Sequence, residues 1–151
     1  MKTTINILLT VIVLLSFSSC EQEDDIEEIF VGKTWYMNGA TINGKRLNSE
    51  IKNFYTEAGE NAYYISFSAG TFRGVLSSGV TFSGTWEADG KRQSIKINIT
   101  DKPDTSITFD KQIYNIISSL SSYSSGADFL HLSKDSDNTL YLSTSRSKVY
   151  N

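Results

Sequence analysis

His131 is the only histidine in this chain of 151 residues, and therefore the only side chain whose unperturbed pKa lies near neutrality. It falls in a predicted strand, out of phase with Leu130 and Leu132. A Ser-His-Asp site needs a carboxylate behind the histidine, but Asp128 is an odd number of strand positions away and points to the opposite face. The chain also has no Gly-x-Ser-x-Gly nucleophile motif. We expect a surface or edge histidine and no enzyme activity, with distant Asp and Ser residues left open as partners.

Two other groups of polar residues could do chemistry. Asp135, Asp137 and Asn138 bring together oxygen atoms that suit calcium, but the spacing, glycine and distal glutamate of a calcium loop are missing. Glu57 and Glu60 flank the end of a predicted helix, which is a poor place to hold two carboxylates at catalytic separation. The sequence therefore predicts no metal site, no catalytic residues and no cofactor.

The charge of the chain excludes one class of partner. Residues 29–151 contain 13 Lys or Arg against 11 Asp or Glu, so this part is nearly neutral. The adjacent cations Lys45-Arg46 and Lys91-Arg92 each lie beside a predicted tight turn, where charge is solvated. A nucleic-acid-binding face would show clustered basic residues. We therefore expect no nucleic acid partner and a single domain of ordinary size.

The N-terminus has the pattern of an export signal. Lys2 precedes a mostly apolar run of 13 residues, Ile5 to Phe17, which is shorter than the roughly 20 residues of a membrane-spanning helix. The run ends in Phe17-Ser18-Ser19-Cys20, which resembles the lipobox of bacterial lipoproteins. The resemblance implies a signal peptide over residues 1–19 and a lipid on Cys20. The alternative is an ordinary signal cleaved near Ser19 that leaves a free thiol.

Cys20 is also the only cysteine, so it cannot form an internal disulfide, and acylation would protect a reactive thiol. Six acids among residues 21–28 predict a solvated, extended tether over residues 20–30, and a cysteine followed by acids resembles the surface-export signal of Bacteroidetes-type lipoproteins. We expect the membrane to be a partner through the lipid on Cys20. The expected location is the outer membrane, on the cell surface or the periplasmic face, with one domain over residues 31–151.

Within that domain the dominant hydrophobic period is two, which indicates antiparallel strands separated by Gly, Asn, Asp and Ser turns. Asn43-Gly44 and Asp89-Gly90 are tight-turn signals, because these residues tolerate positive φ. Residues 118–125 are rich in serine and predict a loop. The predicted strands are Trp35–Ile42, Ala62–Ser68, Thr71–Leu76, Val80–Trp86, Ile95–Ile99, Phe129–Ser133 and Thr139–Ser143.

Two segments have helical periodicity. The apolar residues between Leu47 and Ala58 lie on one helical face, which predicts a short helix there. A second amphipathic helix is predicted over residues 110–121, with Thr108 or Asp110 as its N-terminal cap and an apolar stripe suited to a lid or plug. Many short antiparallel strands must hide their edges, and a small barrel of about eight strands, complete or incomplete, does so.

Short motifs add a resemblance to known families. Gly32-Lys33-Thr34-Trp35 resembles the Gly-x-Trp opening of lipocalin-like domains, with one extra residue. Phe82-Ser83-Gly84-Thr85-Trp86, the late helix and the closing hairpin from Leu130 to Leu142 are similar to the META domain of envelope lipoproteins. The resemblance implies a mostly β, lipocalin-like antiparallel barrel with one or two short helices, in a lipoprotein of uncharacterised function. Neither family carries a shared catalytic residue set.

The first half of the predicted sheet is rich in aromatic residues. A barrel of eight strands is wide enough either to be filled by its own side chains or to hold one small ligand. We therefore predict a non-enzymatic binding role with a small apolar or sugar-like ligand. The alternative is a protein-interaction module, such as an inhibitor or assembly factor of the envelope, acting through outward Tyr64 or Tyr141. The candidate ligand-binding residues are Trp35, Tyr63, Phe67, Phe82 and Trp86.

Overall fold

The computed structural model of the protein describes residues 23–47 and 62–146. The predicted helix between Leu47 and Ala58 lies outside the described residues, apart from Leu47 itself. Most strands coincide with the predicted ones, because β-branched and aromatic residues fit a pleated, half-buried surface. The elements in chain order are α2 (Ile26–Phe30), β1 (Thr34–Ile42), β2 (Lys45–Arg46), β3 (Tyr64–Ser68), β4 (Thr71–Val75), the 3₁₀ helix η1 (Ser77–Gly79), β5 (Thr81–Asp89), β6 (Ser94–Asp101), α4 (Thr108–Ile117), β7 (Ser122–Ser125), β8 (Phe129–Asp135) and β9 (Asn138–Ser143).

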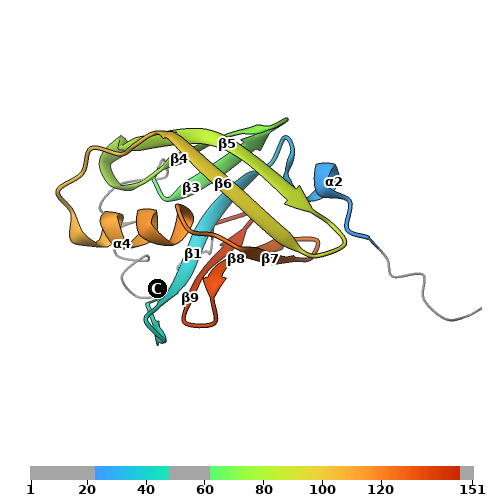
Figure 1. The fold of residues 1–151 in the computed structure, drawn as a ribbon. Helices are drawn as coiled ribbons and strands as arrows, with labels where there is room; N and C mark the ends of the chain where they lie inside the picture. Colours follow the sequence, from blue (N-terminus) through green and yellow to red (C-terminus); the bar gives the residue numbers. More distant parts are fainter. Residues whose placement is uncertain (1–22, 48–61, 147–151) are drawn as a thin grey trace, which may run out of the picture.

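The nine strands of the described segments form one antiparallel sheet that closes in a ring. Neighbouring strands follow the chain order from β3 to β9, and β1 pairs with both β3 and β9 (Figure 1). The short strand β2 pairs only with the far end of β1. Helix α4 lies across one end of the ring and α2 beside the other (Figure 1). The predicted mostly β fold with antiparallel closure is confirmed, and the closure leaves few exposed strand edges.

The join between β6 and β7 is the narrowest in the ring. Only Ser94 and Ser122 are paired there, whereas β5 and β6 share seven residue pairs. Two further backbone bonds reinforce the join, from Ile95 N to Ser121 O at 3.2 Å and from Tyr123 N to Gln93 O at 3.0 Å. The ring is therefore continuous but unevenly closed.

The last hairpin shows how the period of two builds the core. Leu130 lies opposite Leu142 and Leu132 lies opposite Leu140, as the sequence predicts. All four side chains are almost fully buried. Successive side chains of a strand point to opposite faces, so the residues between these leucines face outward. The same alternation in β1 and β3 directs their apolar residues into the ring.

Phe82 explains the glycine at position 74. The two residues lie opposite each other on β5 and β4, and a Cβ on Gly74 would lie 2.0 Å from the Phe82 ring. The ring therefore lies over the glycine backbone, which is the arrangement known as aromatic rescue. Only glycine allows this close approach. The fully buried Phe82 ring occupies the space that a side chain at position 74 would need.

The serine-rich segment differs from its prediction. The sequence predicts a loop over residues 118–125, but Ser122–Ser125 forms β7 and pairs with β8. Only Tyr123 in this strand is buried. One apolar residue among serines gives no periodic signal, so the strand exists because β8 supplies a partner ladder.

The prediction of an extended, solvated tether is wrong for its C-terminal half. Residues Ile26–Phe30 form α2, whose first turn is capped by Asp25 Oδ1 accepting from Glu28 N at 3.0 Å. Phe30 is 0% exposed and belongs to the core. The prediction of an extended tether was based on the acidic residues. The local structure depends instead on the burial of Phe30. Within the described segments, no helix is long and apolar enough to cross a bilayer.

Candidate functional site

The aromatic residues predicted to bind a ligand form the packed core of the ring. Their exposed fractions run from 0% to 8%, and all belong to one hydrophobic cluster. Phe67 meets Trp86 edge to face at 5.2 Å between ring centroids. The Trp86 indole nitrogen donates to Ser68 O at 2.8 Å, so the ring is fixed in place. The structure brings Trp35, Tyr63, Phe67, Phe82 and Trp86 together as buried side chains of one core.

The buried carboxylate of Asp110 lies in the first turn of α4. The sequence predicted this residue only as a possible helix cap. Asp110 is 0% exposed and accepts from Tyr63 Oη at 2.6 Å, Ser77 Oγ at 2.5 Å and Thr105 Oγ1 at 2.9 Å. The helix begins at Thr108 with Ile107 as its cap residue, so neither predicted cap is used. A carboxylate enclosed by three hydroxyl groups is stabilised where it is and has no open path to a substrate. Asp110 therefore has a structural role.

His131 lies on the outer face of β8, as predicted from its phase. Its Nδ1 is 3.5 Å from Ser124 Oγ, and the aromatic neighbours of its ring are Phe129 and Tyr141. Partial burial, and secondarily the positive charge of Arg46, lower the pKa of His131 below its ordinary value. The described segments contain no group of three or more His, Cys, Asp or Glu side chains that could hold a metal.

The rings around His131 form an outward stack that we call the aromatic ladder: Phe129, His131, Tyr141 and Arg46. Consecutive ring centroids are 4.9 Å apart, and the Arg46 guanidinium lies 4.5 Å from the Tyr141 centroid. Tyr141 Oη is also 3.0 Å from Thr41 Oγ1. Phe129 is 43% exposed and is the only exposed large hydrophobic side chain in the described part of the chain. The sequence marked Tyr141 as an outward contact residue and His131 as a surface or edge histidine, but it did not predict the stack, because the stack joins three strands.

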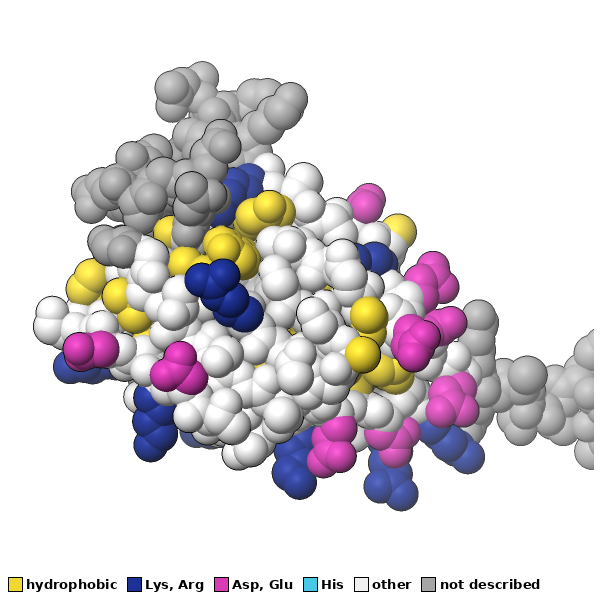
Figure 2. Space-filling model, turned by 90° about the horizontal axis from the view of Figure 1, so that it is seen from above, with side chains coloured by type: hydrophobic (Ala, Val, Ile, Leu, Met, Phe, Trp, Pro, Cys, Tyr) yellow, Lys and Arg dark blue, Asp and Glu magenta, His cyan; other side chains and the backbone are white. Residues whose placement is uncertain are grey.

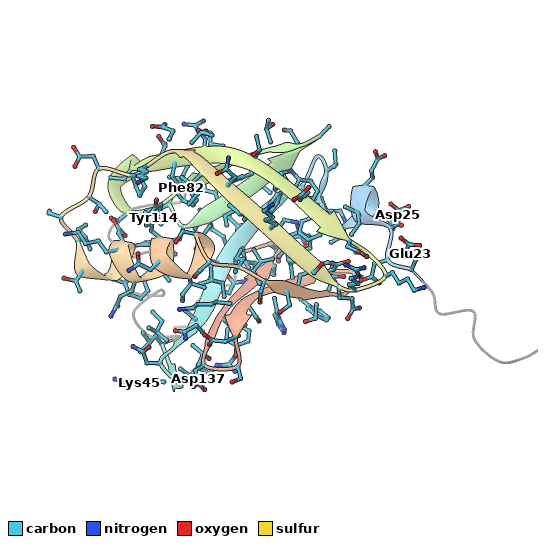
Figure 3. All side chains as sticks on the ribbon, in the orientation of Figure 1. Glu23, Asp25, Lys45, Phe82, Tyr114 and Asp137 are labelled. Atoms are coloured by element: carbon cyan, nitrogen blue, oxygen red, sulfur yellow. The ribbon has the colours of Figure 1, made fainter. Side chains whose placement is uncertain are left out.

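A second surface feature is a pocket of about 220 Å³ between α4 and two turns, which we call the amide pocket. Asn43 comes from the β1–β2 turn, Gln112 and Asn115 from α4, and Lys134 and Asn138 from the β8–β9 hairpin. Its apolar floor is formed by Ile42 and Ile116, which are 7% and 3% exposed. In Figure 3 the labels Lys45 and Asp137 mark the two turns beside it, well away from Glu23 and Asp25 at the α2 end. No single segment of the sequence predicts this pocket.

The walls of the amide pocket are tied together. Asn138 Oδ1 accepts from Asn43 N at 3.1 Å, and Asn138 Nδ2 donates to Asp135 Oδ1 at 2.8 Å. Gly44 N donates to Asp137 O at 2.9 Å. Asn43 and Gly44 have φ of 52° and 75°, which confirms the predicted tight turn. Asp135, Asp137 and Asn138, whose oxygen atoms would suit calcium, therefore hold the two turns in place.

Two other surface hollows are less suited to a ligand. One of about 510 Å³ lies along β5 and β6, and its charged groups, Glu87 and Lys96, pair with each other at 3.3 Å. Another of about 340 Å³ lies beside α2, where Asp25 is occupied in capping the helix. The amide pocket combines a closed apolar floor with polar groups directed from three elements.

Comparisons with known proteins match this arrangement to one family. A crystal structure of a DUF4847 family protein from Bacteroides vulgatus ATCC 8482 has the same fold, with a TM-score of 0.65 and 22% sequence identity. The match covers 82% of this chain and 99% of that one. No curated protein matches the chain. The lipocalin-like and META resemblances remain inferences from short motifs. Residues 21–145 match the domain of unknown function DUF4847, and the chain belongs to that family.

Proposed function

We propose that this protein is a non-enzymatic binding module of the bacterial envelope, anchored to the outer membrane by lipid on Cys20, which holds a small ligand in the amide pocket. The observation that carries the proposal is the contrast between the ring interior and that pocket. The aromatic side chains of the interior are buried and pack in one cluster, whereas the pocket presents polar side chains over an apolar floor. Among the described residues the His131 ring has Ser124 as a polar neighbour, and Asp110 is enclosed by hydroxyl groups, which is consistent with a role without catalysis.

The N-terminal segment is held against the domain close to the proposed lipid site. Asp24 Oδ2 accepts from Tyr123 Oη at 3.0 Å and from Gln93 Nε2 at 3.1 Å. A Cβ on Gly90 would lie 2.3 Å from Asp24 O, so this glycine permits the close approach. Burial, followed by the hydrogen bond to Asp24, raises the pKa of Tyr123, which keeps this hydroxyl a donor. The tether is therefore short.

This short tether supports a defined orientation on the membrane. Four residue steps separate Cys20 from Asp24, which span at most about 14 Å. The α2 end would face the bilayer, and the amide pocket would face away from it (Figures 1 and 3). Acidic side chains are numerous at the α2 end of the face seen in Figure 2. Their repulsion from anionic headgroups would oppose adhesion of the domain to the bilayer.

Changing Cys20 to serine tests the anchor. We expect Cys20→Ser to abolish incorporation of labelled palmitate and to move the protein from the membrane fraction to the soluble fraction, because a serine hydroxyl does not replace the acylated sulfur. Ser19→Ala is the matched control, since a small residue is kept before the cysteine, and it should leave both readouts unchanged. Recovery of the wild-type chain in the soluble fraction without label would contradict the anchor.

The aromatic ladder favours a second candidate, in which the outer face of β8 and β9 docks another envelope protein. Exposed aromatic side chains beside an arginine are typical of interface hot spots. A photo-crosslinking residue at Phe129 should give a discrete adduct in cells, while the same residue at exposed Thr100 on β6 should not. Equal, diffuse labelling at both positions would count against this candidate.

A further inference from the structure

We infer that the amide pocket takes a carbohydrate, one sugar unit or the end of a glycan, and that side-chain amides supply most of its recognition. The inference rests on the proposed function, because it names the ligand of the same pocket.

The lining of the amide pocket contains unused hydrogen-bonding groups. The side-chain amides of Asn43, Gln112 and Asn115 make no hydrogen bond to another described residue, while Asn138 is used to hold the two turns together. Each primary amide offers two N–H donors and a carbonyl acceptor. A sugar hydroxyl also donates and accepts, so several adjacent hydroxyls match several adjacent amides. An aliphatic ligand would cover these amides without pairing them, which is unfavourable.

The lining of the amide pocket carries little charge. Among the described residues no carboxylate lines the pocket, and the one charged lining group is Lys134, which makes no ion pair with another of them. Asp135 lies next to Lys134, and the hydrogen bond from Asn138, followed by smaller contributions that include the positive charge of Lys134, keeps the pKa of Asp135 below its ordinary value. A phosphate or sulfate is normally met by several cations or backbone N–H groups. The pocket therefore fits a ligand that is neutral or weakly charged.

The shape of the amide pocket suits one sugar ring. Ile42 and Ile116 give a nearly buried floor, against which the C–H face of a pyranose ring can pack. The volume of about 220 Å³ is below the roughly 300 Å³ at which pockets for drug-sized ligands begin. One sugar unit suits this space, and the open side of the pocket leaves room for a glycan to continue into solvent.

The test uses the full chain carrying Cys20→Ser, isotope-labelled and titrated by NMR. The probes are the methyl glycosides of glucose, galactose, N-acetylglucosamine and glucuronic acid, with laurate and the dipeptide Gly-Gly as non-sugar comparisons. At least one glycoside should shift the amide signals of Gln112 and Asn115. Gln112→Leu and Asn115→Leu should each weaken that binding about tenfold, because each removes a hydrogen-bonding group. Asn98→Leu on exposed β6 is the matched control and should leave the affinity unchanged.

The outcomes separate this inference from the proposed function. If laurate or Gly-Gly shifts the pocket signals and no glycoside does, the sugar assignment is wrong while a small-ligand pocket stands. If no probe shifts these signals in the folded protein, both the sugar assignment and the pocket as a ligand site are overturned. Glycoside shifts that survive both leucine substitutions would place the sugar elsewhere and would also overturn the inference.

Discussion

Changing Phe30 to alanine is expected to lower the free energy of unfolding by about 3–5 kcal/mol, the usual cost of removing a fully buried aromatic side chain. The Phe30 ring lies 5.1 Å from Phe67, 4.9 Å from Trp86 and 5.2 Å from Tyr123, measured between centroids. Its removal leaves a cavity lined by three aromatic rings that cannot collapse without losing their own contacts. Urea unfolding followed by tryptophan fluorescence measures the change.

Glu27→Ala is the control for Phe30→Ala, because Glu27 lies in the same helix but is exposed. It should change the free energy of unfolding by less than about 0.5 kcal/mol. A small effect of Phe30→Ala, equal to that of the control, would show that α2 does not belong to the folded unit. The expected large effect would instead place the start of the cooperative domain before Phe30, and would make the free tether correspondingly short.

Replacing Asp110 with alanine should destabilise the protein by about 3 kcal/mol or more. The change removes the acceptor for the hydroxyls of Tyr63, Ser77 and Thr105 and leaves buried donors unpaired. Tyr63 also has a φ of 52°, which is unfavourable for a residue with a side chain, and its hydroxyl bond to Asp110 helps to hold this conformation. Thermal and urea unfolding measure the loss.

Milder variants keep the Asp110 prediction testable if the alanine protein does not fold. Tyr63→Phe removes a single bond to the carboxylate and should cost about 1.5–3 kcal/mol, the usual range for a hydrogen bond to a charged group. Tyr64→Phe, at the next residue, where β3 begins, is the matched control because Tyr64 is only partly buried, and it should change stability by less than about 0.5 kcal/mol. Equal losses for the two tyrosine variants would contradict the role assigned to Asp110.

The polar residues of helix α4 differ in their accessibility to a ligand. Asp110 has its hydrogen bonds made inside the fold, so its loss is expected to affect stability and not ligand binding. The amides of Gln112 and Asn115, on the same helix, face the pocket, so their loss is expected to affect binding with little change in stability. Helix α4 thus presents a structural residue at its start and ligand-binding candidates further along.

The amino-acid sequence by itself determined the strand-based fold. Alternating residues in β8 and β9 predicted that Leu130, Leu132, Leu140 and Leu142 face one core, because a strand alternates faces at every residue. Asn43-Gly44 predicted its turn, because both residues tolerate positive φ. These signals are local: each depends on residues that are neighbours in the chain, so no knowledge of the ring is needed to interpret them.

Only the tertiary structure decided where the candidate sites lie. Tyr123 gave no periodic signal, and its strand forms because β8 is beside it. The sequence pattern of Asp110 is that of a helix cap, whereas in the fold its carboxylate accepts hydrogen bonds from Tyr63 and Ser77. The amide pocket joins residues from α4, the β1–β2 turn and the β8–β9 hairpin, segments far apart in the chain. Their distances are set by strand register and by closure of β1 on β9, which are long-range choices that no local pattern encodes.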